Sequence, residues 1–191
     1  MRPLYKLCKT EQSARRQRRL EEGLLSLMLQ KPYDEITISE LCDTLMIPRK
    51  SFYRYFSGKD GALHALIDHT LLDFEQYSGA LSGNGPANVP RDLLHFFEFW
   101  QQHRPLLDAL ERSGLSGVLV QRAISQAQNE YTLPRYQTTP EVRRIQSHAI
   151  TFCICGIMSM VTRWHRSGYT ESPAELAQIA ATLLTRPLMQ G

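Results

Sequence analysis

The fold of this protein is decided by residues 36–59, which read ITISELCDTLMIPRKSFYRYFSGK. The stretch opens with a capping box, in which the Thr37 hydroxyl can accept from the Glu40 backbone N–H while the Glu40 carboxylate reaches back. Apolar residues then follow at helical spacing. Residues 47–48 open another helix, because proline suits a first turn, and a Ser-Gly pair ends that helix. The stretch therefore predicts two short helices joined by a tight turn.

The second of these helices has an apolar face and a face rich in hydrogen-bond donors. At about 100° per residue, Phe52 and Phe56 share one side, and Lys50 and Arg54 point nearly the opposite way. The flanks carry Arg49, Ser51, Tyr53 and Tyr55. Arginine and lysine on such a helix can donate to guanine in the major groove of DNA. The pattern therefore predicts a helix-turn-helix module. The competing interpretation is an ordinary amphipathic helix with a solvated basic face.

The distribution of charge favours a polyanionic partner at one end of the chain. Residues 1–60 contain 12 lysines and arginines against 8 acidic residues, whereas residues 61–191 contain 10 against 11. All five lysines lie within the first 59 residues. A basic module on a near-neutral body indicates nucleic acid or another polyanion as partner. Chance scatter of surface charge is the alternative.

Nearly every other segment also shows helical spacing, which predicts an all-α protein of about nine helices. The predicted domains are a three-helix helix-turn-helix module over residues 10–60, a connecting helix over 60–78 and a helical body over 79–191. A loop is expected over residues 78–90, which are rich in Gly, Pro, Asn and Ser. Helices are expected at residues 10–29, 91–103, 105–113, 116–130, 140–167 and 173–185.

Several classes of function lack support in the sequence. The four cysteines form no Cys-x-x-Cys pair and have no histidine at zinc spacing, so we expect free thiols, no metal and no cofactor. A disulfide between Cys153 and Cys155 is disfavoured because alternate helical residues point apart. No catalytic signature supports a helical enzyme. We expect a cytoplasmic protein, since no signal peptide is evident and the charge-free run 145–162 is too polar for a membrane span and suits a buried helix.

Residues 12–77 resemble the DNA-binding domain of the TetR family of bacterial transcriptional regulators. The resemblance is carried by the Thr37 cap, the turn at 46–48 and the Tyr-x-x-Phe-x-x-Lys motif at 53–59. It implies that Ser39, Arg49, Lys50, Ser51 and Arg54 contact bases or the nearby backbone. It also implies that Thr37, Tyr53, Tyr55 and Lys59 contact phosphates.

Two positions depart from the family pattern. Met46 stands in the turn where glycine is usual, and a positive φ there would cost on the order of 1 kcal/mol relative to glycine. Tyr55 stands where histidine is usual, so the position keeps a hydrogen-bonding tip without a positive charge. Both departures leave the DNA-binding interpretation in place.

The resemblance implies that residues 79–191 bind a small ligand and dimerise. Stripes of apolar residues on the two C-terminal helices suit a four-helix interface between two copies, and their alternative role is to close the monomer core. The expected interface residues are Ile157, Val161, Trp164, Ile179 and Leu183. The aromatic helix 91–103 has more large apolar residues than one face can hold, so some line a cavity or simply pack in the core. The expected ligand-binding residues are Phe96, Trp100, His103, Phe152 and Met158.

The function implied is that of a dimeric repressor which a small molecule releases from DNA. Two recognition helices would enter successive major grooves of a pseudo-palindromic operator, roughly 34–36 Å apart. The ligand would act by favouring one separation of the two helices. The alternative is a TetR-like co-activator or protein-interaction module with an idle DNA head, for which Met46 is the sequence hint.

Overall fold

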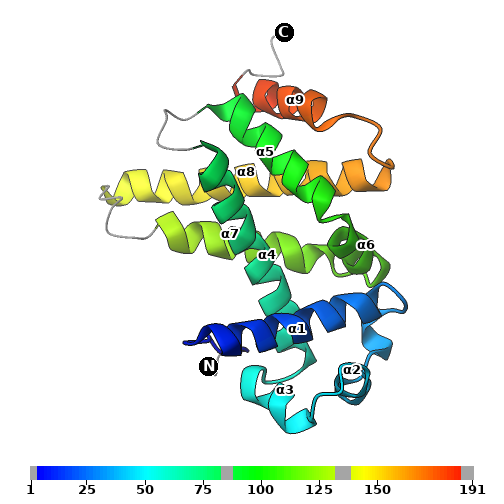
Figure 1. Cartoon of the computed structure of the whole chain (residues 1–191). Coiled ribbons are helices and arrows are strands. Elements are labelled where there is room, and N and C mark those ends of the chain that lie inside the picture. The colour runs from blue at the N-terminus through cyan, green and yellow to red at the C-terminus, as the bar shows by residue number, and fades with distance from the viewer. Residues whose placement is uncertain (1–3, 83–87, 132–138, 186–191) are drawn as a thin grey trace. The chain divides into compact units, whose positions relative to one another are not determined.

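A computed structural model describes residues 4–82, 88–131 and 139–185 of the chain (Figure 1). Within these ranges the backbone forms nine α-helices, a short 3-10 turn at Tyr33–Glu35 and no strand, so the predicted all-α class is confirmed. The helices are α1 (Glu11–Met28), α2 (Ile38–Thr44), α3 (Arg49–Tyr55), α4 (Lys59–Ser82), α5 (Val89–Gln102), α6 (Arg104–Arg112), α7 (Ser116–Tyr131), α8 (Pro140–Arg166) and α9 (Pro173–Thr185).

The chain divides into two compact units. The first consists of Met1–Thr70 with Pro105–Ser116, and the second consists of Leu71–Arg104 with Gly117–Gly191. Helix α4 begins in the first unit and ends in the second. The two compact units are defined by contacts, whereas the domain boundaries expected at residues 60 and 78 separate parts that fold independently. These boundaries therefore stay a prediction.

The core of the first unit is built by the apolar stripes of α1, α3 and α4. Helix α1 starts at Thr10, whose hydroxyl accepts from the Ser13 backbone N–H at 3.3 Å. Burying such stripes is the main source of stability for short helices, which are marginal alone. The buried side chains are Leu20, Leu24, Leu27, Met28, Phe52, Phe56, Leu63, Leu66 and Ile67.

The second unit is organised around the aromatic helix α5, which packs against α9. The rings of Phe97 and Trp164 meet edge-on, with centroids 5.9 Å apart. The Trp164 indole N–H donates to the Glu171 carbonyl at 2.8 Å and so ties the end of α8 to the segment before α9. Hydrogen bonds from Ser172 hold the pKa of Glu175 below its usual value at the start of α9.

Helix α8 is less covered than its sequence predicts. Within the described residues, one helix, Arg144–Arg166, is long and apolar enough to span a membrane, which alone is weak evidence for a span. Only 11% of its most apolar window is buried within this chain. The expectation of a buried helix at 145–162 is therefore wrong for the single chain, because no helix among the described residues covers its outer side.

Smaller differences concern helix ends and thiols. Pro48 lies at the N-cap, one position before the expected first turn of α3. Helix α4 continues to Ser82, and residues 83–87 of the expected loop lie outside the described residues. The four cysteines are free as expected, although only Cys42 is fully buried.

Candidate functional site

The turn region of the site is held by the cap of α2. The Thr37 hydroxyl accepts from the Glu40 backbone N–H at 3.1 Å, as the capping box predicts. The Lys31 ammonium donates to the Glu40 carboxylate at 2.7 Å, and this bond lowers the pKa of Glu40, with a smaller contribution from the Thr37 backbone N–H. The cap therefore links the end of α1 to the start of α2.

The turn between α2 and α3 has the strained backbone that its sequence suggests. Met46 has a φ of +54°, in the left-handed region that favours glycine. Its side chain is 88% exposed, so no packing offsets the strain. Hydrogen bonds from Met46 N–H to the Asp43 carbonyl and from Ile47 N–H to the Cys42 carbonyl close the turn.

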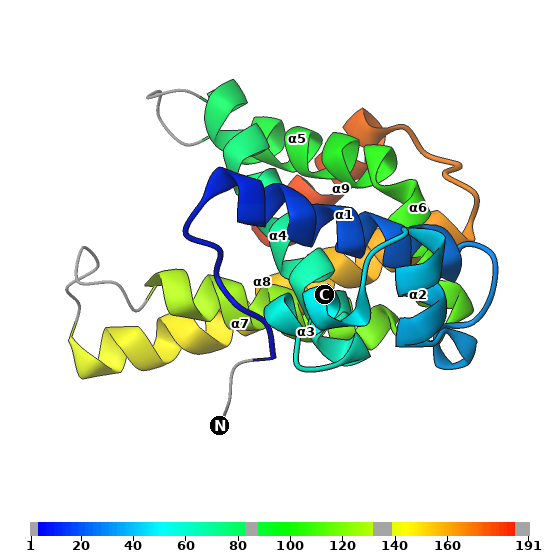
Figure 2. The ribbon, with the colours of Figure 1, turned by 60° about the horizontal axis from the view of Figure 1, so that its bottom comes forward.

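Helix α3 lies beside α1 and α2 (Figure 2), and its donor side chains are exposed to solvent. Phe52 and Phe56 are buried with ring centroids 5.1 Å apart, which fixes the rotation of the helix. Tyr53 is 57% exposed. The other exposed side chains of this face are Arg49, Lys50 and Arg54, and Ser51 is half-buried. The predicted division into an apolar face and a basic face is therefore present.

Tyr55 and Lys59 lie in different surroundings from the rest of the expected DNA-contacting set. Tyr55 is only 5% exposed. The Lys59 ammonium donates to the carbonyl oxygens of Tyr33 at 2.6 Å and Ile36 at 2.8 Å. It also lies 4.2 Å from the centre of the Tyr33 ring. Phosphate contacts by Tyr55 and Lys59 stay a prediction, and both residues have clear structural roles.

Tyr33 itself is a central polar anchor of the first unit. Its hydroxyl donates to the Asp60 carboxylate at 2.6 Å, and its backbone N–H donates to the Ser113 hydroxyl at 3.1 Å. Burial, followed by the bond to Asp60, raises the pKa of Tyr33 well above its ordinary range. The loop before α2 is thereby attached to both α4 and the end of α6.

Arginines of α1 join the basic face, a feature that we did not assign from sequence. A hollow of about 210 Å³ lies between α1 and α3. Arg16 and Arg19 of α1 line it together with Ser51 and Arg54 of α3. The Arg19 guanidinium also donates to the Leu45 carbonyl at 3.2 Å. The run of arginines at 15–19 was the available signal, but only the helix crossing selects which of them face α3.

In the second unit, three of the five expected ligand-binding residues lie together on α5. The Trp100 and His103 rings are 6.4 Å apart, and the Phe96 and Trp100 rings are 6.3 Å apart. His103 stacks on Phe99 and its Nδ1 lies 2.8 Å from the Phe99 carbonyl oxygen. Trp100 is fully buried, and within the described residues its indole N–H has no hydrogen-bond partner. Met158 is buried on α8.

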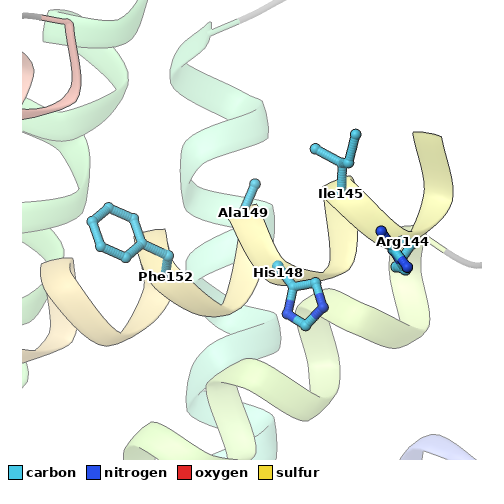
Figure 3. Close-up of a pocket in the computed structure, with 5 residues that line it drawn as sticks. All are labelled: Arg144, Ile145, His148, Ala149 and Phe152. Atoms are coloured by element: carbon cyan, nitrogen blue, oxygen red, sulfur yellow. The ribbon is translucent and has the colours of Figure 1, made fainter. Parts of the chain in front are cut away.

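Phe152 lies on the outer side of α8. It is 78% exposed and borders an open depression of about 510 Å³ with Ile145 and His148 (Figure 3). Arg144 and Ala149 complete the lining of this depression. Ile145 is also exposed, so the N-terminal half of α8 carries an uncovered apolar face.

The expected dimer residues fall into three groups by burial. Val161 and Trp164 are buried within the unit itself. Ile157 is half-buried. Ile179 and Leu183 are 45% and 42% exposed, and they border a hollow of about 280 Å³ between α8 and α9. A dimer contact by these residues is not tested by a single chain and stays a prediction.

Comparison with known proteins agrees with this geometry. Residues 22–66, which include the cap, the turn and α3, match the family described as bacterial regulatory proteins, tetR family. This part of the chain therefore carries a TetR-family DNA-binding domain. No curated protein matches it significantly.

Solved structures show that the TetR-like fold extends along the whole chain. The fatty acid degradation regulator FadR from Bacillus halodurans is 12% identical with a TM-score of 0.58, covering 97% of this chain and 100% of its own. A TetR-like transcriptional regulator from Rhodococcus sp. RHA1 is 15% identical with a TM-score of 0.56, covering 95% and 100%. A tetR-family regulator from Streptomyces coelicolor is 20% identical with a TM-score of 0.53, covering 90% and 81%. At these identities the likeness concerns the fold alone.

Among the described residues, no group of three or more His, Cys, Asp and Glu side chains could hold a metal ion.

Proposed function

We propose that this TetR-family regulator is a cytoplasmic, non-enzymatic repressor that binds a pseudo-palindromic operator as a homodimer and is released by a small molecule. The observation that carries the proposal is the outer face of α3, where Arg49, Lys50 and Arg54 are exposed. The aromatic anchors Phe52 and Phe56 keep that face turned outward. Exposed arginine and lysine on an anchored helix suit the guanine edges of the major groove.

The contact set that we propose follows exposure. Lys50 and Arg54 read bases, and Arg49 and Tyr53 flank them on the same helix. Ser51, and Thr37 and Ser39 at the start of α2, contact the nearby backbone. Tyr55 and Lys59 stay in the set as proposed phosphate contacts, in addition to the burial of Tyr55 and the bonds from Lys59 to backbone carbonyl oxygens.

Sequence-specific DNA binding is tested on a duplex that the wild-type protein selects from a random 30-bp library. Replacing Lys50 or Arg54 by alanine should weaken binding to that duplex by about 1–3 kcal/mol and relax the preference at one base pair. Arg104→Ala, an exposed arginine of the second unit outside the hollow between α8 and α9, is the matched control and should bind as the wild type does. Failure of the wild type to select any duplex would contradict the proposal.

The homodimer is supported by the apolar surface of α8 and α9. Ile145, Phe152, Ile179 and Leu183 are large apolar residues with 42–78% of their surface exposed. Contiguous exposed apolar surface marks interaction sites more often than free surface. A second copy related by twofold symmetry would cover the same surface on both chains.

The small-molecule ligand is supported by Trp100. A fully buried indole N–H without a partner among the described residues is costly unless a ligand or water accepts from it. We propose that an apolar ligand with one acceptor binds beside Trp100 and His103. Compounds that raise the Tm of the wild type in a thermal-shift screen should lose that effect in Trp100→Phe, which keeps an aromatic ring and removes the donor. Retention of the full shift would contradict this site.

A further inference from the structure

The segment before α1 is docked against the end of α3. Its backbone forms an isolated antiparallel bridge between Tyr5 and Phe56. The Lys6 N–H donates to the Tyr55 carbonyl at 2.9 Å, and the Ser57 N–H donates to the Leu4 carbonyl at 2.9 Å. Figure 2 shows this dark-blue segment, residues 4–9, passing α3 on its way to α1. We call residues 4–9 the N-terminal arm.

The inner side of the N-terminal arm is locked by polar contacts. The Tyr5 hydroxyl donates to the buried Asp68 carboxylate, and its ring meets the His69 ring edge-on with centroids 6.0 Å apart. His69 Nδ1 in turn lies 2.8 Å from the carboxylate of Glu21, which is fully buried. Arm, α1 and α4 therefore share one network, which holds Tyr5 in a single position.

Gly61 is required for this docking. A Cβ atom at Gly61 would lie 2.1 Å from the Leu4 carbonyl oxygen, a backbone atom that cannot rotate away. The position is in the first turn of α4, where alanine would otherwise be the better helix former. Glycine is therefore needed at position 61 because the backbone of the N-terminal arm approaches α4 so closely there.

The outer side of the N-terminal arm is basic. Side chains alternate along extended backbone, so Tyr5 points inward while Lys6 points outward. Lys6, Leu7 and Lys9 are exposed. Lys6 is paired with Tyr55, directly next to the exposed Arg54 of the recognition helix. The bridge therefore places Lys6 beyond the C-terminal end of α3, and Lys9 follows it as an exposed residue of the arm.

We propose that the N-terminal arm is a second DNA-binding element, in which Lys6 and Lys9 bind backbone phosphates beside the groove that α3 enters. This inference rests on the function proposed above for α3. Lysine acts on phosphate as a point charge without the planar fork that reads guanine, so the arm adds affinity for any sequence. The docking of Leu4 and Tyr5 fixes the backbone that carries Lys6 beforehand, which reduces the entropy lost on binding.

The first test is the salt dependence of binding to the duplex selected by the wild type. Each phosphate neutralised by the protein adds about 0.9 to the magnitude of the negative slope of log K against log salt. The double variant Lys6→Ala/Lys9→Ala should therefore reduce the magnitude of the slope by about 1.8. Its base preference should stay that of the wild type, in contrast to Lys50→Ala. The charge-preserving variant Lys6→Arg/Lys9→Arg should keep the wild-type slope.

The second test moves the N-terminal arm without touching its lysines. Gly61→Ala should displace the arm, lower the salt slope and speed hydrogen exchange at the Lys6 and Ser57 amides, which are bonded across the bridge. Gly79→Ala on the same helix meets no atom within 4 Å and is the matched control. It should leave the slope and the exchange of both amides unchanged.

The outcomes separate the two proposals. A wild-type salt slope in the double alanine variant, with specific binding intact, would overturn the role of the N-terminal arm and leave the function of α3 standing. Absence of DNA binding by the wild type would overturn both. If Gly61→Ala fails to fold, the lysine variants, whose side chains are exposed, still decide the question.

Discussion

The ammonium of Lys59 lies 2.6 Å from the carbonyl oxygen of Tyr33 and 4.2 Å from the centre of the ring of the same residue. It also donates to the Ile36 carbonyl at 2.8 Å. The last residue of the Tyr-x-x-Phe-x-x-Lys motif therefore fastens the start of α4 to the loop between α1 and α2. That loop leads directly into the cap at Thr37, so the position of α2 depends on this lysine.

Lys59→Met is expected to lower the free energy of unfolding of the protein more than Lys50→Met does. Removing a charged donor from buried carbonyls costs roughly 1.5–3 kcal/mol, whereas an exposed surface substitution usually stays within about 0.5 kcal/mol. Urea unfolding followed by circular dichroism measures the difference. Lys50→Met, at an exposed position of α3, is the control. Equal unfolding midpoints in the two variants would contradict the structural role.

Met46→Gly is expected to stabilise the protein. The left-handed backbone at Met46 costs a side-chain-bearing residue about 1–2 kcal/mol, and the added freedom of glycine in the unfolded chain returns part of that gain. A net increase of roughly 0.5–1 kcal/mol in the free energy of unfolding should appear as a higher Tm. Met46→Ala keeps a Cβ atom and should show no such gain. A lower Tm for the glycine variant would refute the strain.

The pair of Lys31 and Glu40 predicts a loss of stability in acid. Because folding lowers the pKa of Glu40, the stabilisation is complete above its ordinary value of 4.5 and disappears as the pH falls through the lower folded value. Glu40→Gln should therefore lower the urea midpoint at pH 7 and match the wild type at the acidic end of a titration from pH 7 to pH 3. In a Lys31→Met background the substitution should have a smaller effect at pH 7. A difference that persists unchanged at pH 3 would point to a cause other than this carboxylate.

The double variant Ile179→Glu/Leu183→Glu is expected to be monomeric. Both side chains are substantially exposed in the single chain, so charge at these positions should leave the helical circular dichroism spectrum intact. Light scattering at micromolar concentration should give twice the chain mass for the wild type and the chain mass for the variant. Leu72→Glu, an exposed leucine on α4, serves as a control that should remain dimeric. A monomeric wild type would remove the dimer from the proposal.

Local signals in the sequence predicted the helix-turn-helix region well. Thr37 and Glu40 form the expected cap, and Phe52 and Phe56 anchor α3 as their spacing indicates. The strained turn at Met46 was also evident, because glycine is usual there. Each of these features depends on residues a few positions apart, where helix geometry alone determines which side chains meet.

Contacts between distant segments could not be predicted in this way. The motif that placed Lys59 on DNA carries no information about the three carbonyl oxygens around its ammonium, at Tyr33, Asp34 and Ile36. Phe152 was expected to bind a ligand; it lies on the outer side of α8, where it borders an open depression. Which face of a long helix is covered depends on the helices packed against it, and α8 has apolar residues on more than one side.

The all-α class, the capped turn and the identity of the basic helix could be predicted from the amino-acid sequence, because periodicity and capping are local. Tertiary packing set how residues far apart in the chain cooperate. It joined the N-terminal arm to Phe56 and Asp68, selected Arg16 and Arg19 as neighbours of α3, and turned Lys59 inward. These contacts arise from the packing of α1, α3 and α4 against one another, in which hydrogen bonds span tens of residues and no short pattern records the partner.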